Sequence, residues 1–189
     1  MTPAHLVSLG LALAVTLAPR PAAAEDPGAL ELTAAAALVI PGAIYVEPYT
    51  WDTGVGLGAN LGLDYRVAPR LSAGLVAQYT ATTLTELDVG AKAAGLGASL
   101  KVLLGDPRAI HFKVGVNVLY QLDWIDAKGA DDAHGLGLGL LVEGLYPVAP
   151  RSSLVGQLGF VTQPSGGNPS AEVTWGPLFF LGVGVAFGP

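Results

Sequence analysis

The sequence predicts an all-β fold, a transmembrane antiparallel up-and-down β-barrel of eight strands. Three observations lead to this prediction. The chain is too apolar for an ordinary soluble domain, with 51% hydrophobic and only 13% charged residues. Beyond its first residues it nevertheless contains no apolar run of the roughly 20 residues that a spanning helix needs. Its apolar residues instead alternate with small or polar residues over long stretches, which is typical of membrane strands.

The clearest alternation lies between Gly54 and Arg70. Odd-numbered positions from Val55 to Val67 are apolar, and the even-numbered positions between them are small or polar. A period of two indicates one extended strand with an apolar face and a small or polar face. Such a strand, tilted by about 40°, rises roughly 35 Å, which is enough to cross a hydrocarbon layer.

The N-terminal residues have the pattern of an export signal and are not expected to form part of the barrel. An apolar run from Leu6 to Ala18 is broken by prolines and followed by Ala22-Ala23-Ala24, which offers a cleavage site. We therefore expect residues 1–24 to be a cleaved signal peptide and residues 25–189 to be a barrel domain in the cell outer membrane.

Seven more segments repeat the alternation and complete the set of eight strands. In chain order, with the strand that begins at Gly54 standing second, they are Leu30 to Ile40, Leu71 to Thr83, Gly90 to Gly105, Ile110 to Trp124, Gly135 to Val148, Ser152 to Gln163 and Val173 to Phe187. The segments between them are expected to be a loop from Pro41 to Asp52, an acidic connection from Leu84 to Val89, and loops from Ile125 to Ala133 and from Pro164 to Glu172.

Two kinds of connection alternate along the chain. The stretch from Tyr65 to Arg70, which ends in Val-Ala-Pro-Arg, recurs from Tyr146 to Arg151, and Asp106-Pro107-Arg108 lies between them. Short turns at one end and longer loops at the other are the asymmetry of periplasmic turns and extracellular loops. The arginines of these turns either meet anionic lipid headgroups or are simply solvated.

Aromatic residues on the apolar face fall near the two ends of the predicted strands. They form two lipid-interface girdles around an aliphatic band, as membrane barrels require. The residues are Tyr65, Phe112, Tyr146 and Phe187 near the short turns, and Tyr79, Tyr120, Phe160, Trp175 and Phe179 near the long loops.

These features resemble the OmpA/OmpX-type small outer-membrane β-barrels of Gram-negative bacteria. The resemblance is one of pattern and covers essentially all of residues 25–189. It implies outer-membrane lipid and lipopolysaccharide as surroundings. It also implies that the barrel-assembly machinery recognises the last strand through Phe187, with Leu181, Val183 and Val185 at alternating positions.

Charged residues on the opposite face are expected to point into the barrel. Because charges of both signs occur at similar depth, they predict salt bridges that plug the lumen; the alternative is a polar conduit or gate. These residues are Glu31, Asp64, Arg66, Lys101, His111, Lys113, Asp123 and Glu143. Many lumen-facing glycines leave room that Leu119, Val161 and Phe180 fill, or that forms a pocket for a small apolar ligand.

The first function hypothesis is therefore a non-enzymatic outer-membrane barrel with a structural or surface-interaction role. The second is a small porin-like pore or a barrel that binds or transports a small ligand. A lipid A-modifying enzyme would need His111 beside a nucleophilic serine, and no such pair is evident.

Asp126, Asp131, Asp132 and His134 share one loop and could hold a divalent cation, but their spacing matches no calcium loop, so we expect no metal and no cofactor. The net charge of −6 argues against a nucleic-acid partner, and the sequence names no partner for the loops.

Overall fold

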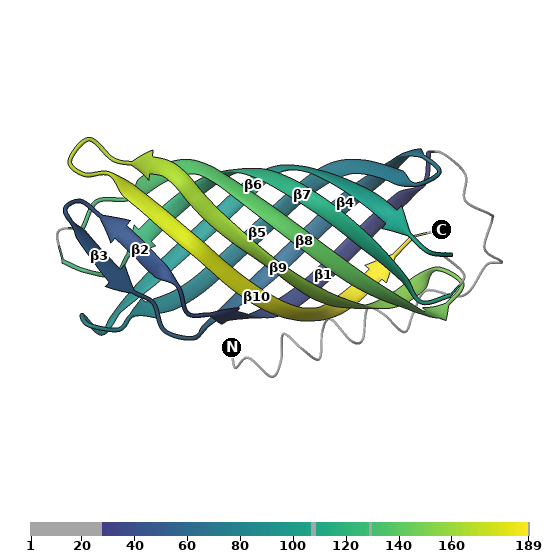
Figure 1. Ribbon diagram of the computed structural model, residues 1–189, viewed down its shortest axis with the longest axis horizontal. Helices are drawn as coiled ribbons and strands as arrows, with labels where there is room; N and C mark the ends of the chain where they lie inside the picture. The colour runs from purple at the N-terminus through teal and green to yellow at the C-terminus, as the bar shows by residue number, and fades with distance from the viewer. Residues whose placement is uncertain (1–27, 107–108, 129, 189) are drawn as a thin grey trace.

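The computed structural model describes residues 28–106, 109–128 and 130–188, which form a closed antiparallel β-barrel (Figure 1). The predicted signal peptide, residues 1–24, lies outside the described residues. The wall consists of β1 (Leu30–Ile40), β4 (Gly56–Ala68), β5 (Leu71–Leu84), β6 (Val89–Leu104), β7 (His111–Ile125), β8 (Ala133–Ala149), β9 (Ser152–Gly167) and β10 (Val173–Phe187). Each strand pairs with the next in this order, and β1 pairs with β10, which closes the ring. The predicted eight-stranded barrel is confirmed.

The described residues contain no helix of the length and apolar character that crossing a membrane would require. Their strands instead separate two kinds of side chain. In β4, Leu61 and Leu63 are 54% and 42% exposed, whereas Asn60 and Asp64, which flank this pair along the strand, are buried. An apolar surface that surrounds the whole molecule in this way is a surface for lipid.

The connections differ between the two ends of the barrel. Tight turns join β4 to β5 and β8 to β9, and residues 105–110 join β6 to β7 at the same end, where the C-terminus also lies (Figure 1). We call this the short-turn end. The opposite end, the long-loop end, carries residues 41–55, 85–88, 126–132 and 168–172.

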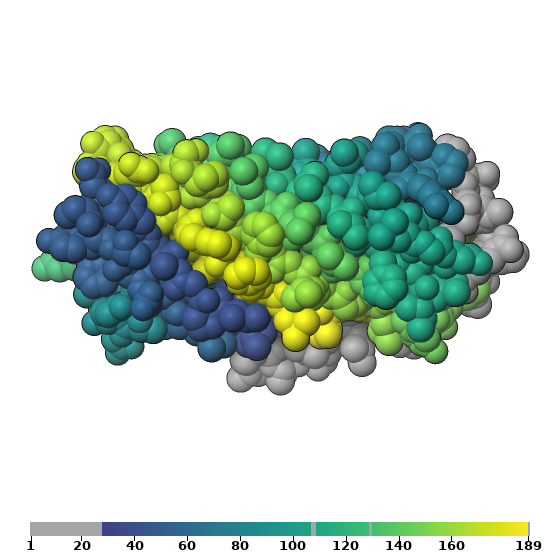
Figure 2. Space-filling view, viewed as in Figure 1, coloured from purple at the N-terminus to yellow at the C-terminus, as the bar shows by residue number. Residues whose placement is uncertain are grey.

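The segment from Pro41 to Asp52 is not the plain loop that the sequence predicted. It holds a hairpin of two short strands, β2 (Ala43–Val46) and β3 (Tyr49–Asp52). Strand β2 pairs with β10, so the hairpin continues the wall beyond β1 at the long-loop end, where Figure 2 shows it beside β10. Four-residue strands are too short for the alternation to reveal, and the hairpin is held by the pairing of β2 with a strand more than a hundred residues away.

Trp175 does not lie on the lipid face, as the sequence predicted, but inside the barrel, where it is 3% exposed. The pairing of β10 with β9 shifts between Trp175 and Leu178, around Gly176 and Pro177. A β-bulge inserts one extra residue and reverses the alternation beyond it. Pro177, which lacks a backbone N–H, is tolerated at such a position.

Candidate functional site

The interior nearer the short-turn end is organised around Lys101, which is 3% exposed. Its Nζ atom lies 2.8 Å from Asp64 Oδ2 and 3.0 Å from Glu143 Oε2. The three residues come from β6, β4 and β8, so the contacts cross the barrel. One ammonium group thus binds two carboxylates that are each 1% exposed.

Uncharged side chains complete this network, which we call the central network. Ser99 Oγ donates to Asp64 Oδ1 at 3.2 Å, and Gln157 Nε2 donates to Glu143 Oε1 at 2.9 Å. Asn60 Nδ2 in turn donates to Gln157 Oε1 at 3.1 Å. Because charged groups are stable in an interior only when their remaining hydrogen-bonding capacity is used, these donors matter as much as the ion pairs.

A second ion pair lies closer to the short-turn end, where Lys113 contacts Glu31. Thr33 Oγ1 also donates to Glu31, at 3.5 Å. Arg66 lines a cavity of about 10 Å³ together with Glu31, Asp64 and Lys113. This part of the interior therefore brings three cationic and three anionic side chains together.

Two glycines allow large side chains to cross the interior. A Cβ atom at Gly115 would lie 2.6 Å from Lys101 Cγ, and one at Gly159 would lie 2.6 Å from Phe180 Cζ. Both distances are below carbon contact distance, so any larger residue would displace its neighbour. Gly115 and Gly159 therefore leave the space that Lys101 and Phe180 occupy.

The half of the interior toward the long loops is mainly apolar, although Gln121, Asp123 and Gln163 are also buried there. Its buried residues form one cluster, made up of Val39, Ile44, Val76, Leu84, Ala91, Ala93, Leu119, Ala133, Val161, Val173, Trp175 and Leu178. Ile44 comes from the β2–β3 hairpin and is fully buried, so the hairpin covers the mouth of the barrel. Two further cavities inside the wall are each about 10 Å³, which is room for about one water molecule.

Among the described residues, the hydrogen-bond partner of the His111 ring is a backbone carbonyl. Its Nδ1 atom lies 3.0 Å from the carbonyl oxygen of Ala109, and no hydroxyl group of the described residues is hydrogen bonded to the ring. Asp123, at the other end of β7, also points inward and accepts a hydrogen bond from Gln121 at 2.9 Å.

The acidic residues of the loop between β7 and β8 do not assemble around one point. Asp126 pairs with Lys92 at 2.6 Å, and Asp131 accepts a hydrogen bond from Ser170 at 3.4 Å. His134 faces outward, with its ring stacked on Tyr120 at a centroid distance of 5.8 Å. Within the part of the chain that the structure describes, no three His, Asp or Glu side chains form a metal-binding cluster.

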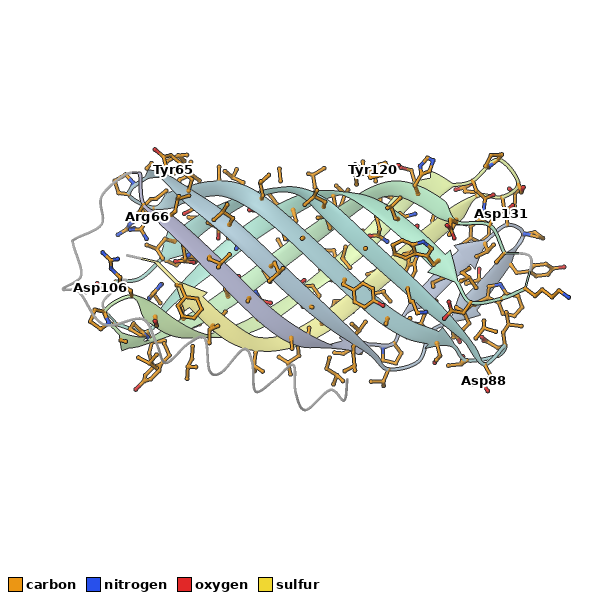
Figure 3. All side chains as sticks on the ribbon, turned by 180° about the vertical axis from the view of Figure 1, so that it is seen from behind. Tyr65, Arg66, Asp88, Asp106, Tyr120 and Asp131 are labelled. Carbon is orange, nitrogen blue, oxygen red and sulfur yellow. The ribbon has the colours of Figure 1, made fainter. Side chains whose placement is uncertain are left out.

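Apart from Trp175, the aromatic residues assigned to the girdles point outward. Tyr65, Phe112 and Tyr146 are 48%, 49% and 55% exposed toward the short-turn end, where Phe187 also lies. Toward the long loops, Tyr79, Tyr120 and Phe179 are 43%, 57% and 47% exposed. Phe160 is half-buried because its ring packs on Phe179. Figure 3 shows Tyr65 near Arg66 at one end, with Asp88 and Asp131 at the other.

Sequence reasoning from charge alone missed the amide side chains of the interior. Asn60, Gln121, Gln157 and Gln163 are all buried. Each lies an even number of residues from an inward-facing charge or glycine on the same strand. The alternation therefore already indicated that these amides point inward.

Comparisons with protein-family models and with curated protein sequences give no match. Solved structures do match. Neisserial surface protein A, NspA, is 18% identical with a TM-score of 0.63 over 85% of this chain and 98% of its own. The outer membrane protein OprG from Pseudomonas aeruginosa is 13% identical with a TM-score of 0.54, over 87% and 97% of the two chains. The outer membrane protein AlkL is 12% identical with a TM-score of 0.56, over 92% and 95%. The chain therefore has the fold of small outer-membrane barrels.

Proposed function

We propose that this chain, which has the fold of small eight-stranded outer-membrane barrels, is a non-enzymatic and non-conducting barrel that acts through its long-loop end. The observation that carries this proposal is the filled interior. Ion pairs and amides occupy the half near the short turns, and the apolar cluster occupies the other half. A path for ions or solutes would need far more room than cavities of about 10 Å³.

The surface available for interaction is strongly acidic. Exposed carboxylates at the long-loop end are Glu47, Asp52, Glu86, Asp88, Asp126, Asp131, Asp132 and Glu172. The same end also carries two lysines, Lys92 and Lys128, and Lys92 is already paired with Asp126. Tyr49 and Leu87 add exposed apolar area, at 62% and 45%. A cationic partner with some apolar surface fits this end, because complementary charge speeds encounter and selects the partner.

A pore is the competing function, and single-channel recording separates the two. The barrel is inserted into planar bilayers, and we expect no steady conductance. The control is a triple variant, Lys101→Ala, Leu119→Ala and Trp175→Ala, which removes side-chain volume from both halves of the interior. This variant should show brief conducting events. Steady conductance of the unmodified barrel would contradict the proposal.

The surface role is tested by binding to vesicles that display the barrel. Poly-lysine should be retained at low salt and released as salt is raised, because the attraction between exposed charges is screened. Poly-glutamate should not bind. Equal retention of the two polymers would show that the acidic end selects no partner charge.

A further inference from the structure

The two tight turns at the short-turn end are built from the same sequence. The stretch Tyr-x-Val-Ala-Pro-Arg-x-Ser leads from β4 into β5, starting at Tyr65, and again from β8 into β9, starting at Tyr146. In both copies the strand pairing shifts between the second and the fourth residue of the stretch. Because a bulge sets the direction of the side chains around it, the two turns hold their residues in the same arrangement.

Each copy places a tyrosine and a valine on the lipid face and an arginine in the turn itself. Both tyrosines are exposed, and so are Val67 and Val148, which lie two residues further along the chain. Arg70 and Arg151 follow three residues after the valines and are exposed as well. Aromatic side chains on the outside of a membrane barrel lie at the level of the lipid headgroups. Each arginine therefore stands where its leaflet carries phosphate groups.

The backbone of both arginines is held in place, whereas their side chains are available for binding. The carbonyl oxygen of Arg70 accepts a hydrogen bond from the N–H of Leu103 at 2.9 Å, and that of Arg151 accepts one from Gly188 at 3.1 Å. Neither guanidinium group forms an ion pair or a hydrogen bond with another described residue. Each turn thus presents a positioned cation with all of its N–H donors available.

The two arginines lie on opposite sides of the barrel. Strands β6 and β7 separate the two hairpins on one side of the ring, and β10 and β1 separate them on the other. The carboxylates that reach the surface of this end, within the described residues, are those of Glu31 and Asp106. Glu31 is paired with Lys113, and Asp106 is engaged as well. Anionic groups are therefore attracted to the short-turn end and repelled by the acidic long-loop end.

We propose that Arg70 and Arg151 bind the phosphate groups of anionic phospholipids in the leaflet that meets the short-turn end. A planar guanidinium group matches a phosphate with two parallel hydrogen bonds. The tyrosine and valine of the same turn lie against the acyl chains of that lipid, which distinguishes a lipid from an anionic polymer outside the membrane. A zwitterionic headgroup fits less well, because its ammonium group finds no unengaged carboxylate among the described residues of this end.

Binding on opposite sides fixes the depth of the short-turn end in its leaflet. Charged side chains beside aromatic residues are the anchors that set how a membrane protein sits in the bilayer. This role is separate from the proposed role of the long-loop end, so either proposal can fail without the other.

The first test uses the full-length barrel in nanodiscs of equal parts phosphatidylglycerol and phosphatidylcholine. Native mass spectrometry identifies the lipids that stay bound when the barrel is released. We expect phosphatidylglycerol to be retained over phosphatidylcholine by about fivefold per site, and the preference should weaken as salt is raised. Equal retention of the two lipids would overturn the proposal. Displacement of the lipid by an equal concentration of glycerophosphoglycerol, the headgroup without acyl chains, would also overturn it, since any phosphate ester would then suffice.

Matched variants locate the two sites. Arg70→Gln and Arg151→Gln should each lower the retention of phosphatidylglycerol, and the double variant should lower it further. Arg70→Lys keeps the charge and loses the paired hydrogen bonds, so its retention should be intermediate. Lys128→Gln, which removes an exposed cation at the long-loop end, should leave retention unchanged. A preference that the double substitution does not alter would refute the sites.

Two further measurements complete the test. Resistance of each variant to SDS before boiling shows that its barrel is folded, as expected for substitutions of exposed side chains without partners. Sedimentation with purified peptidoglycan tests the other anionic surface that this end could meet. Binding of the unmodified barrel that the double variant loses, without any preference among lipids, would assign the arginines to that polymer and overturn the lipid sites.

Discussion

Replacing Lys101 by methionine is the most informative perturbation of the interior. Methionine keeps the length and the apolar stem of lysine and removes the ammonium group. The lost contacts are those of Nζ, at 2.8 Å from Asp64 and 3.0 Å from Glu143. Both carboxylates are 1% exposed, so water does not replace the ammonium group.

The expected loss follows from this burial. Removing one partner of a buried ion pair costs about 3–5 kcal/mol, because the other charge remains buried without compensation. Here two carboxylates lose the same cation, so we expect a value in the upper part of that range at neutral pH.

The assay is reversible unfolding by urea of the barrel in lipid vesicles, followed by tryptophan fluorescence. Lys128→Met, at an exposed lysine in the loop between β7 and β8, is the control and should change the unfolding free energy by less than about 0.5 kcal/mol. Adding Asp64→Asn and Glu143→Gln to the Lys101 variant should recover part of the loss, because no buried charge then remains. A loss below about 1 kcal/mol for Lys101→Met would refute the central network as a buried ionic structure.

Two further pairs of variants test the two faces of the wall by the same urea unfolding. Leu140→Arg places a charge on the outward face, where Leu140 is 38% exposed, and should lower the free energy of unfolding by about 2–4 kcal/mol. Gly139→Ser, one residue away on the inward face, should lower it by less than about 1 kcal/mol. Equal losses would mean that the faces are reversed. Gly115→Val would force its Cβ atom against Lys101 Cγ, at 2.6 Å, and should cost about 1–3 kcal/mol. Gly156→Val on the outward face meets no atom within 4 Å and should be nearly neutral; a larger loss at Gly156 than at Gly115 would contradict the packing.

The strands were predictable from sequence where the alternation was unbroken. The predicted bounds of β1, Leu30–Ile40, agree with the structure, and so do those of β10, Val173–Phe187, whose alternation is unbroken only from Leu178 onward. In β1 the alternation runs to Ile40, and Pro41 ends it. In such strands each residue's face follows from its neighbours, and no knowledge of pairing is needed.

The errors arose where pairing between distant strands decides the geometry. Trp175 faces inward because of a bulge at Gly176 and Pro177, which depends on the register of β10 against β9. The β2–β3 hairpin is held by β10 at Val173 to Trp175. Neither relation is visible in a local pattern.

The interior charges were predictable as a set but not as pairs. The alternation of faces along each strand alone indicates that Lys101, Asp64 and Glu143 point inward. Which carboxylates Lys101 reaches depends on the shear of the closed barrel and on space left by Gly115. The amides around Asp123 carry no charge, so a search for ionisable residues did not find them.

The central claim is that the apolar face of the strands meets lipid and the polar face lines a filled interior. The most direct measurement is the electrophoretic mobility in SDS of the membrane-extracted protein, with and without boiling. A closed barrel with a satisfied polar interior should resist the detergent until it is heated, so the unboiled protein should migrate as a separate, compact band. A single band under both conditions, from protein found in the soluble fraction, would show that the two faces have been assigned the wrong way round.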